Sequence, residues 1–232
     1  PLTALLFAEL CEEVGLPPGV FNLVTGDGTT GAALVQHPEI SKIAFTGSTG
    51  VGKYIQKETA DRDIGLTLEL GGKAANIVFN DAAIDQAVEG VVNGIFFNQG
   101  HVCCAGSRLV LQEDIHDQFV SKLEKRMQSL RVGNPLDKNT DIGAINSKEQ
   151  LDKISELVNN GVDEGGSIFQ TECELPQNGF WFKPTLFTNA QPSYRIAREE
   201  IFGPVLTTLT FRTPEEAIEI SNNTEYGLSA GI

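Results

Sequence analysis

Short apolar segments alternate with longer amphipathic segments along the chain, and this alternation constrains the fold more than any other feature. In the first third, apolar runs at 20–26, 42–47 and 64–72 predict strands. Consecutive parallel strands need a crossover, which is usually a helix, so the alternation predicts an α/β fold with parallel sheets. The helices predicted between and before these strands are 3–14, 29–37 and 49–60.

The same alternation continues to the end of the chain. Strands are predicted at 76–79, 107–112, 181–188 and 204–211, and helices at 82–98, 114–130, 148–160 and 213–223. With 232 residues, 41% of them hydrophobic, the chain is long enough to bury a core. It opens within a helical pattern, and 226–232 reads as the start of a strand, so we expect a fragment of a longer protein.

The net charge and the cysteine content limit the binding partners and the cellular compartment that we expect for this protein. The net charge of −14, with no block of Lys and Arg, argues against nucleic acid and anionic membrane surfaces as partners. No apolar run approaches the ~20 residues that span a bilayer, and the first residues do not resemble a secretory leader. The four cysteines do not suggest a dense disulfide framework, so we predict a cytoplasmic protein. They are Cys11, Cys103, Cys104 and Cys173.

Two glycine-rich loops each follow a predicted strand and precede a predicted helix. The first contains Gly26, Gly28 and Gly31 in the spacing of a dinucleotide-binding loop, but the acid expected about 20 residues later is absent. Simple turn chemistry is therefore the alternative for this loop.

The second glycine-rich loop, "FTGSTGVGK" at 45–53, places Ser48 at the start of a helix. Free N–H groups and the positive end of the helix dipole suit a diphosphate there, and Gly47 and Gly52 allow close backbone approach. The loop lacks the spacing of a P-loop, and an ordinary Ser cap is the alternative.

Glu69 ends the apolar strand of "LTLELGGK", directly before the glycine-rich turn of Gly71 and Gly72. Open α/β sheets bind their ligands at the carboxyl ends of strands, and a carboxylate is costly to bury there unless it is used. A partly buried carboxylate would suit a general base that acts on water. A solvated acid at a strand end is the alternative.

The run "FFNQGHVCCAG" at 96–106 places two thiols in a loop flanked by glycines. Cys103 is a plausible nucleophile because small neighbours leave room for a substrate. Zinc would need four ligands, and His101, Cys103 and Cys104 are too crowded to supply a tetrahedron. A Cys–His pair is disfavoured because residues two apart in an extended loop point in opposite directions. Inert packing of a free cysteine also remains open.

The segments "FTGSTGVG", "LELGGKAAN", "FNQGHVCCAGSR" and "EEIFGPV", in this order, resemble the NAD(P)-dependent aldehyde dehydrogenase superfamily. The resemblance covers essentially the whole chain. It implies an α/β fold in which 1–70 is the second half of a Rossmann-type cofactor-binding domain. Residues 71–232 would then form a catalytic domain that is truncated at its C-terminal end.

This resemblance implies oxidation of an aldehyde to a carboxylic acid with NAD or NADP. Cys103 would be the nucleophile that forms a thioester, and Glu69 would be the general base that hydrolyses it. Glu200 would hold the nicotinamide ribose, and Phe202 would pack beside the nicotinamide ring. The other residues implied to lie at the cofactor are Gly26, Gly31, Gly47, Ser48, Gly52 and Leu70, with Ser48 at the diphosphate and the Leu70 backbone near the nicotinamide.

The chain departs from the family pattern in several ways. His101 stands where the family usually has Gln. The Asn that completes the family's oxyanion hole, the Lys-Pro-x-Glu segment that holds the adenosine ribose, and the strands used in oligomers are not in this sequence. The full-length parent is expected to be a homo-oligomer, and this chain alone could be inactive.

Two other functions stay open from the sequence. A non-catalytic module related to dehydrogenases would use the same fold for binding or assembly. CoA-acylating relatives form the same thioester but commonly lack the glutamate, so Glu69 favours hydrolysis.

Overall fold

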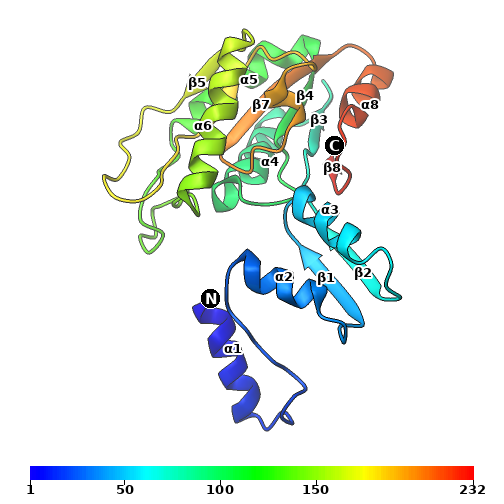
Figure 1. Ribbon diagram of the computed structural model, residues 1–232. Helices are drawn as coiled ribbons and strands as arrows, with labels where there is room; N and C mark the ends of the chain where they lie inside the picture. The colour runs from blue at the N-terminus through cyan, green and yellow to red at the C-terminus, as the bar shows by residue number, and fades with distance from the viewer. The chain divides into compact units, whose positions relative to one another are not determined.

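The computed structural model describes residues 1–232 and divides them into two units, Pro1–Leu70 and Gly71–Ile232 (Figure 1). We call these the first unit and the second unit. The roles of 1–70 as part of a cofactor domain and of 71–232 as a catalytic domain stay predictions. None of the helices has the length and apolarity required to cross a bilayer.

The first unit contains a two-stranded parallel sheet in which Lys42 pairs with Gly65 and Thr46 pairs with Glu69. Its elements are α1 (Leu2–Glu13), α2 (Gly28–Gln36), β1 (Lys42–Thr46), α3 (Thr49–Glu58) and β2 (Gly65–Glu69). Helices α2 and α3 are joined by Gln36, whose Nε2 donates to the Tyr54 hydroxyl at 3.2 Å and to Glu58 Oε2 at 3.1 Å. The strand–helix order of 42–69 is as the sequence predicts.

One predicted strand of the first unit is wrong. Residues 20–26 pair with no other strand, although the sequence predicts a strand there. Strand geometry is stabilised by hydrogen bonds to a neighbouring strand, and no segment of this chain supplies that neighbour. The apolar side chains of Val20, Phe21 and Val24 are accordingly exposed.

The second unit is built on a six-stranded sheet with the order β5-β6-β7-β4-β3-β8. Only β5 and β6 pair antiparallel, and the other neighbours are parallel. The strands are β3 (Ala75–Val78), β4 (Arg108–Gln112), β5 (Ile168–Gln170), β6 (Thr185–Phe187), β7 (Val205–Phe211) and β8 (Ala230–Gly231). The helices are α4 (Ile84–Phe96), α5 (His116–Met127), α6 (Lys148–Asp163), α7 (Arg195–Arg198) and α8 (Pro214–Asn222), with 3₁₀ turns at Phe97–Gly100 and Glu113–Ile115.

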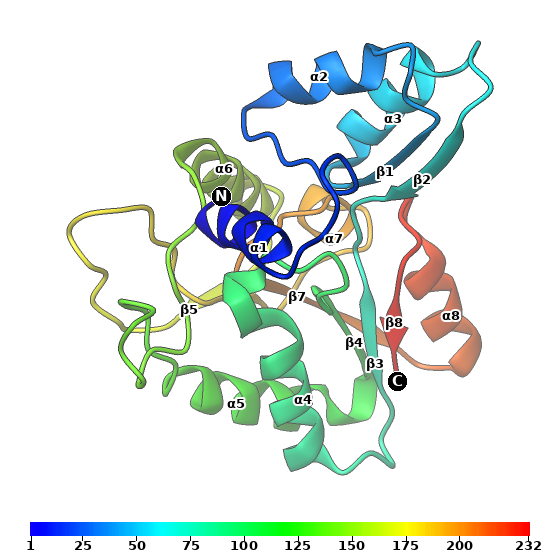
Figure 2. The ribbon, with the colours of Figure 1, turned by 90° about the horizontal axis from the view of Figure 1, so that it is seen from below.

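Helices cover both faces of this sheet (Figure 2). Successive side chains of β4 point to opposite faces of the sheet, because side chains alternate in direction along a strand. Leu109 and Leu111 pack in the cluster that contains α4 and α5, whereas Val110 packs in the cluster that contains Ala217 of α8. Helix α6 packs on β7 in a third cluster. The parallel sheet buried between helices confirms the α/β fold predicted from the alternation.

Candidate active site

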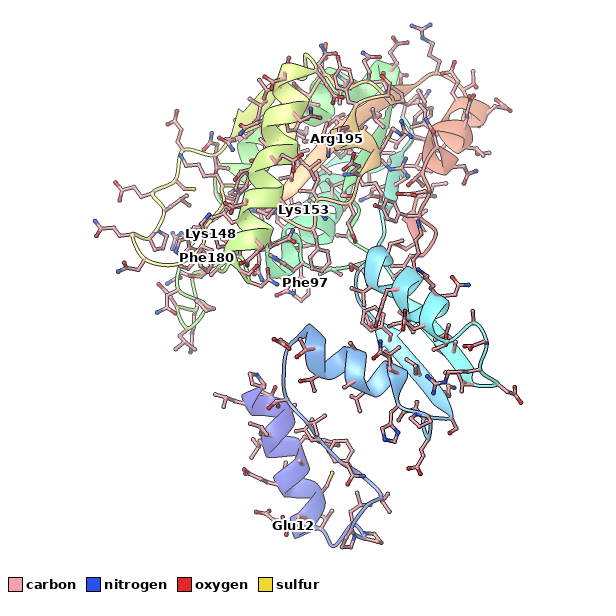
Figure 3. All side chains as sticks on the ribbon, viewed as in Figure 1. Glu12, Phe97, Lys148, Lys153, Phe180 and Arg195 are labelled. Atoms are coloured by element: carbon pink, nitrogen blue, oxygen red, sulfur yellow. The ribbon has the colours of Figure 1, made fainter.

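The loop that carries the two adjacent thiols, which we call the thiol loop (97–107), connects α4 to β4 in the second unit. Phe97, labelled in Figure 3, begins the loop and is 71% exposed. The backbone then turns through left-handed conformations at Asn98 (φ 50°), Gln99 (φ 47°) and Gly100 (φ 74°). Two consecutive non-glycine residues in this region are uncommon, and such strain clusters at functional sites.

Cys103 is half-buried in the thiol loop, and its neighbour Cys104 is exposed. Both thiols are free, so this pair forms no disulfide. The Cys103 N–H donates no hydrogen bond within the chain, whereas the following turn is closed by Ala105 N–H and the Val102 carbonyl at 3.1 Å. The loop therefore presents a thiol and an uncommitted backbone donor on the same residue.

A glycine pair, Gly71 and Gly72, joins Cys103 to Glu200. A Cβ on Gly72 would lie 2.2 Å from the Cys103 carbonyl oxygen, and a Cβ on Gly71 would lie 2.5 Å from Glu200 Oε2. The Gly72 N–H also donates to Glu200 Oε1 at 3.0 Å. Only glycine allows both approaches. The structure thus brings together two residues predicted for the site that are far apart in the sequence.

Glu200 and the three residues after it form a second turn, which we call the aromatic turn (200–203). Phe202 has a left-handed backbone, with φ 56°. Gln150, three residues after the Ser147 cap of α6, donates through Nε2 to the carbonyls of Ile201 at 2.8 Å and Phe202 at 3.0 Å. Sequence reasoning missed Gln150, because nothing in a helical pattern distinguishes one glutamine that bonds a distant turn.

His101 contacts the aromatic turn through its ring. The His101 and Phe202 rings lie edge-to-face, with centroids 5.1 Å apart and an interplanar angle of 85°. Neither ring nitrogen of His101 has a hydrogen-bond partner, and burial lowers the pKa of the imidazole below its usual value. The neutral form is therefore favoured.

Lys73, in the segment "LELGGK", is a buried residue that sequence reasoning did not single out. Its side chain is 1% exposed, and its Nζ has no hydrogen-bond partner. Burial is the main cause that lowers its pKa to about 7, with a contribution from the neighbouring Arg108 and against the opposing effect of Glu200. Arg108 is also buried and donates through Nε to the Lys73 carbonyl at 2.8 Å.

A pocket of about 590 Å³ opens elsewhere in the second unit, between α7 and the loop after α8. Its lining includes Arg198, Asn223 and Tyr226 but not Cys103. Because this pocket contains no candidate nucleophile, it does not define the active site. The candidate active site is defined by the thiol loop.

In the first unit, the residues predicted for the diphosphate lie together at the start of α3. Ser48 caps this helix, and its Oγ accepts a hydrogen bond from Val51 N–H at 3.3 Å. The first turn contains no acidic residue, and the N–H groups of Thr49 and Gly50 donate to no acceptor within the chain. This end of α3 therefore has the donors and the dipole that suit a diphosphate.

Gly47, Gly52, Glu69 and Leu70 surround the same end of α3. The Gly47 N–H donates to the Glu69 carbonyl at 3.0 Å. A Cβ on Gly52 would lie 2.4 Å from Leu70 Cδ2, so glycine is needed there for packing against Leu70. The Glu69 side chain is exposed. The first unit itself therefore does not provide the partial burial that the sequence led us to expect for this carboxylate.

The first glycine loop is arranged differently. Asp27, between Gly26 and Gly28, caps α2. Its Oδ1 accepts hydrogen bonds from the Thr29 N–H at 2.9 Å and from the Thr29 hydroxyl at 2.6 Å. These bonds lower the pKa of Asp27. A carboxylate that occupies the helix N-terminus competes with a phosphate for the same donors. The roles predicted for Gly26 and Gly31 near the cofactor stay predictions.

Comparisons of this chain with known proteins, by sequence and by structure, point to one family. This chain aligns over its whole length with an aldehyde dehydrogenase of Emericella nidulans, at 46% identity, and with human retinal dehydrogenase 2, at 47% identity. It covers 47% and 45% of those proteins, so the chain spans about half the length of the curated relatives it matches.

A solved structure agrees with the sequence relatives. The NAD⁺ complex of an aldehyde dehydrogenase from Bacillus cereus has a TM-score of 0.95 and 41% identity, over 99% of this chain and 47% of that one. The model of the aldehyde dehydrogenase family matches residues 1–232. The resemblance noted in the four sequence segments is thereby confirmed, and the chain belongs to the aldehyde dehydrogenase family.

Proposed function

We propose that the protein containing this chain oxidises an aldehyde to a carboxylic acid with NAD or NADP, through a thioester on Cys103. The observation that carries the proposal is the glycine pair. The absent side chain of Gly72 lets the Cys103 backbone carbonyl lie against it, and the Gly72 N–H donates to the carboxylate of Glu200. The same short turn therefore contacts both the residue proposed as the nucleophile and the carboxylate proposed to bind the ribose, which supports the proposal.

In the proposed mechanism, the Cys103 thiolate adds to the carbonyl carbon of the aldehyde and gives a hemithioacetal. Its oxyanion accepts a hydrogen bond from the Cys103 N–H, which has no other acceptor within the chain. The bound nicotinamide supplies the hydride acceptor. Loss of hydride from the hemithioacetal carbon leaves the thioester, and Glu69 takes a proton from the water that hydrolyses it, which frees the thiolate and the acid.

The residues at the start of α3 fit the cofactor's diphosphate. Ser48 and the free N–H groups of Thr49 and Gly50 would hold it, with Gly47 and Gly52 leaving room for backbone approach. The Bacillus cereus relative was solved with NAD⁺. We propose the remaining cofactor contacts for Gly26, Gly31, the Leu70 backbone, Glu200 and Phe202.

We further propose that the first unit is the second half of a cofactor domain and that the second unit is most of a catalytic domain. Four free cysteines support a reducing, cytoplasmic location. The net charge of −14 supports small-molecule substrates rather than nucleic acid or membrane partners. Family resemblance supports a homo-oligomeric full-length protein.

The direct test uses the full-length protein, an aldehyde panel and both cofactors. Cys103→Ala should abolish NADH or NADPH formation, because the family motif assigns the nucleophile to Cys103, while Cys104→Ala should keep most of it. The matched pair separates the nucleophile from its exposed neighbour. Equal losses from the two substitutions would contradict the assignment of Cys103, and an inactive wild type would favour a non-catalytic module.

A further inference from the structure

Two strained turns of the second unit pack against each other beside Cys103. The backbone of the thiol loop is left-handed at Gly100, and a Cβ there would lie 2.1 Å from the Gly203 carbonyl oxygen of the aromatic turn. A small cavity of about 10 Å³ is lined by residues of both turns. The two turns therefore cannot shift independently at this contact.

His101 is the next residue after this contact, and its ring reaches Phe202. The edge-to-face arrangement, with centroids 5.1 Å apart, is a favourable geometry for an aromatic pair. Gln150 holds the backbone of Phe202 through its carbonyl, which leaves the side-chain torsions of Phe202 unrestrained by that bond. The imidazole contacts the ring itself.

The surroundings of His101 in this chain offer no polar partner to its ring. Both nitrogens are buried without a hydrogen-bond partner. A buried polar atom without a partner is costly, so polar contacts do not explain why a histidine stands here. Burial also lowers the pKa of the imidazole, and the neutral ring is not poised as a general base by any hydrogen bond. What the residue provides is a flat aromatic surface against Phe202.

We propose that His101 is a positioning residue that holds the Phe202 ring edge-to-face and thereby fixes the aromatic wall against which the nicotinamide rests. This inference rests on the proposed function, which assigns that wall to Phe202. It adds a connection between the cofactor and the nucleophile, because His101 precedes Cys103 by two residues in the same strained loop.

The test is a double-mutant cycle in the full-length protein, with the dissociation constant for NAD⁺ measured by titration calorimetry. His101→Leu and Phe202→Leu should each weaken binding by about three- to tenfold, the range expected from one aromatic pair. The double variant should bind no more weakly than Phe202→Leu alone, because the two residues act through one contact. Single-turnover NADH formation should show the same non-additive pattern.

Control variants separate positioning from general damage to the loop. His101→Phe keeps an aromatic edge without polar atoms and should restore NAD⁺ affinity to within about twofold of wild type. His116→Leu, the same change on α5, should have no effect. Labelling of Cys103 by iodoacetamide should stay at the wild-type rate in the His101 variants. If His101→Leu fails to fold, His101→Ala replaces it in the same cycle with the same expected non-additivity.

The outcomes distinguish this inference from the proposed function. Additive losses in the cycle, or unchanged affinity in His101→Leu, would overturn the positioning role while wild-type NAD⁺ binding and aldehyde oxidation persist. A wild-type protein that binds no NAD⁺ and oxidises no aldehyde would overturn both.

Discussion

Single residues of this chain are fixed by atoms that lie far away in the sequence. Gly72 donates to a carboxylate 128 positions later, and its missing side chain leaves space for the carbonyl of Cys103. A side chain at this position would press on backbone, which cannot move aside as a flexible side chain can. The position of the proposed nucleophile therefore depends on a neighbouring residue that has no chemistry of its own.

A substitution of Glu69 can distinguish a catalytic role of this residue from a structural role. Glu69→Gln keeps nearly the same size and an amide oxygen, but it cannot take a proton from water. In the full-length protein we expect a burst of one NADH per active site, followed by a loss of turnover of roughly 10²–10⁴-fold. Mass spectrometry should find the acyl group on Cys103, and hydroxylamine should release it.

Two results would change the assignment of Glu69. A variant that loses the burst but keeps its fold and NAD⁺ affinity would show that Glu69 acts earlier, for example in activating Cys103. Normal steady-state turnover would remove Glu69 from the mechanism and leave it as an exposed acid at the end of β2.

Lys73 predicts a pH dependence of stability. Its pKa falls to about 7 on folding, mainly through burial, whereas an unfolded lysine titrates near 10.5. Between these two values the unfolded chain binds the extra proton, so stability rises with pH by up to about 1.4 kcal/mol per unit. Below about pH 7 both states are protonated, and the cost of the buried charge is fully present.

Lys73→Met removes this titration and keeps an unbranched apolar side chain. We expect the variant to be more stable than wild type at pH 7, with an advantage that shrinks by about 2 kcal/mol between pH 7.5 and 9. Thermal or urea unfolding of the full-length proteins across this range measures the difference. A constant difference would mean that Lys73 keeps its charge state on folding.

Among the secondary-structure elements, β4 and α8 are joined by one buried cation. Arg108 lies at the start of β4 and is 2% exposed. Its guanidinium donates to the carbonyls of Ile220 at 2.8 Å and Ser221 at 2.7 Å, in the last turn of α8. The Ile220 carbonyl also accepts from Asn223 N–H at 3.3 Å, whereas the Ser221 carbonyl has no backbone donor, so Arg108 completes the C-terminal cap of α8 from the sheet.

Arg108→Met should release the end of α8 and leave the partly buried Ser221 carbonyl without a donor. We expect a loss of about 3 kcal/mol in stability and faster hydrogen exchange of α8 amides. Arg212→Met is a suitable control, because Arg212 forms an exposed ion pair with Glu113 at 2.7 Å, and the loss of such a pair should change stability little. Equal losses in the two variants would argue against the capping role.

Considered as a whole, the molecule distributes its core unevenly between the two units. In the first unit the buried hydrophobic residues are Val35 and Ile55, and the strands β1 and β2 contain no buried residue. The second unit has three hydrophobic clusters on the two faces of its sheet. Stability follows buried apolar area, so the second unit should supply most of the stability of this chain.

This difference predicts unequal folding of separately expressed pieces. Residues 71–232 should fold and unfold cooperatively in urea, as followed by circular dichroism, whereas residues 1–70 should show no cooperative transition. In the whole chain, amides of β4 and β7 should exchange slowly and those of β1 and β2 quickly. A cooperative transition in isolated 1–70 would contradict this interpretation of its core.

The sequence by itself determined the element types and the family, because hydrophobic periodicity and short motifs are local properties. The helices and strands from 29 to 112 were predicted to within a few residues, and the motif around Cys103 and Glu69 identified the family. Local patterns could not show that 20–26 lacks a partner strand, nor reveal the short elements β5 and α7.

Only the tertiary structure decided which side chains meet. Three contacts of the second unit join residues that are 50 or more positions apart: Gly72 with Glu200, His101 with Phe202, and Gln150 with the aromatic turn. Such contacts depend on strand order and on how loops close over the sheet, and the one-dimensional pattern does not encode either. For the same reason, the buried state of Lys73 became visible only once the chain was folded around it.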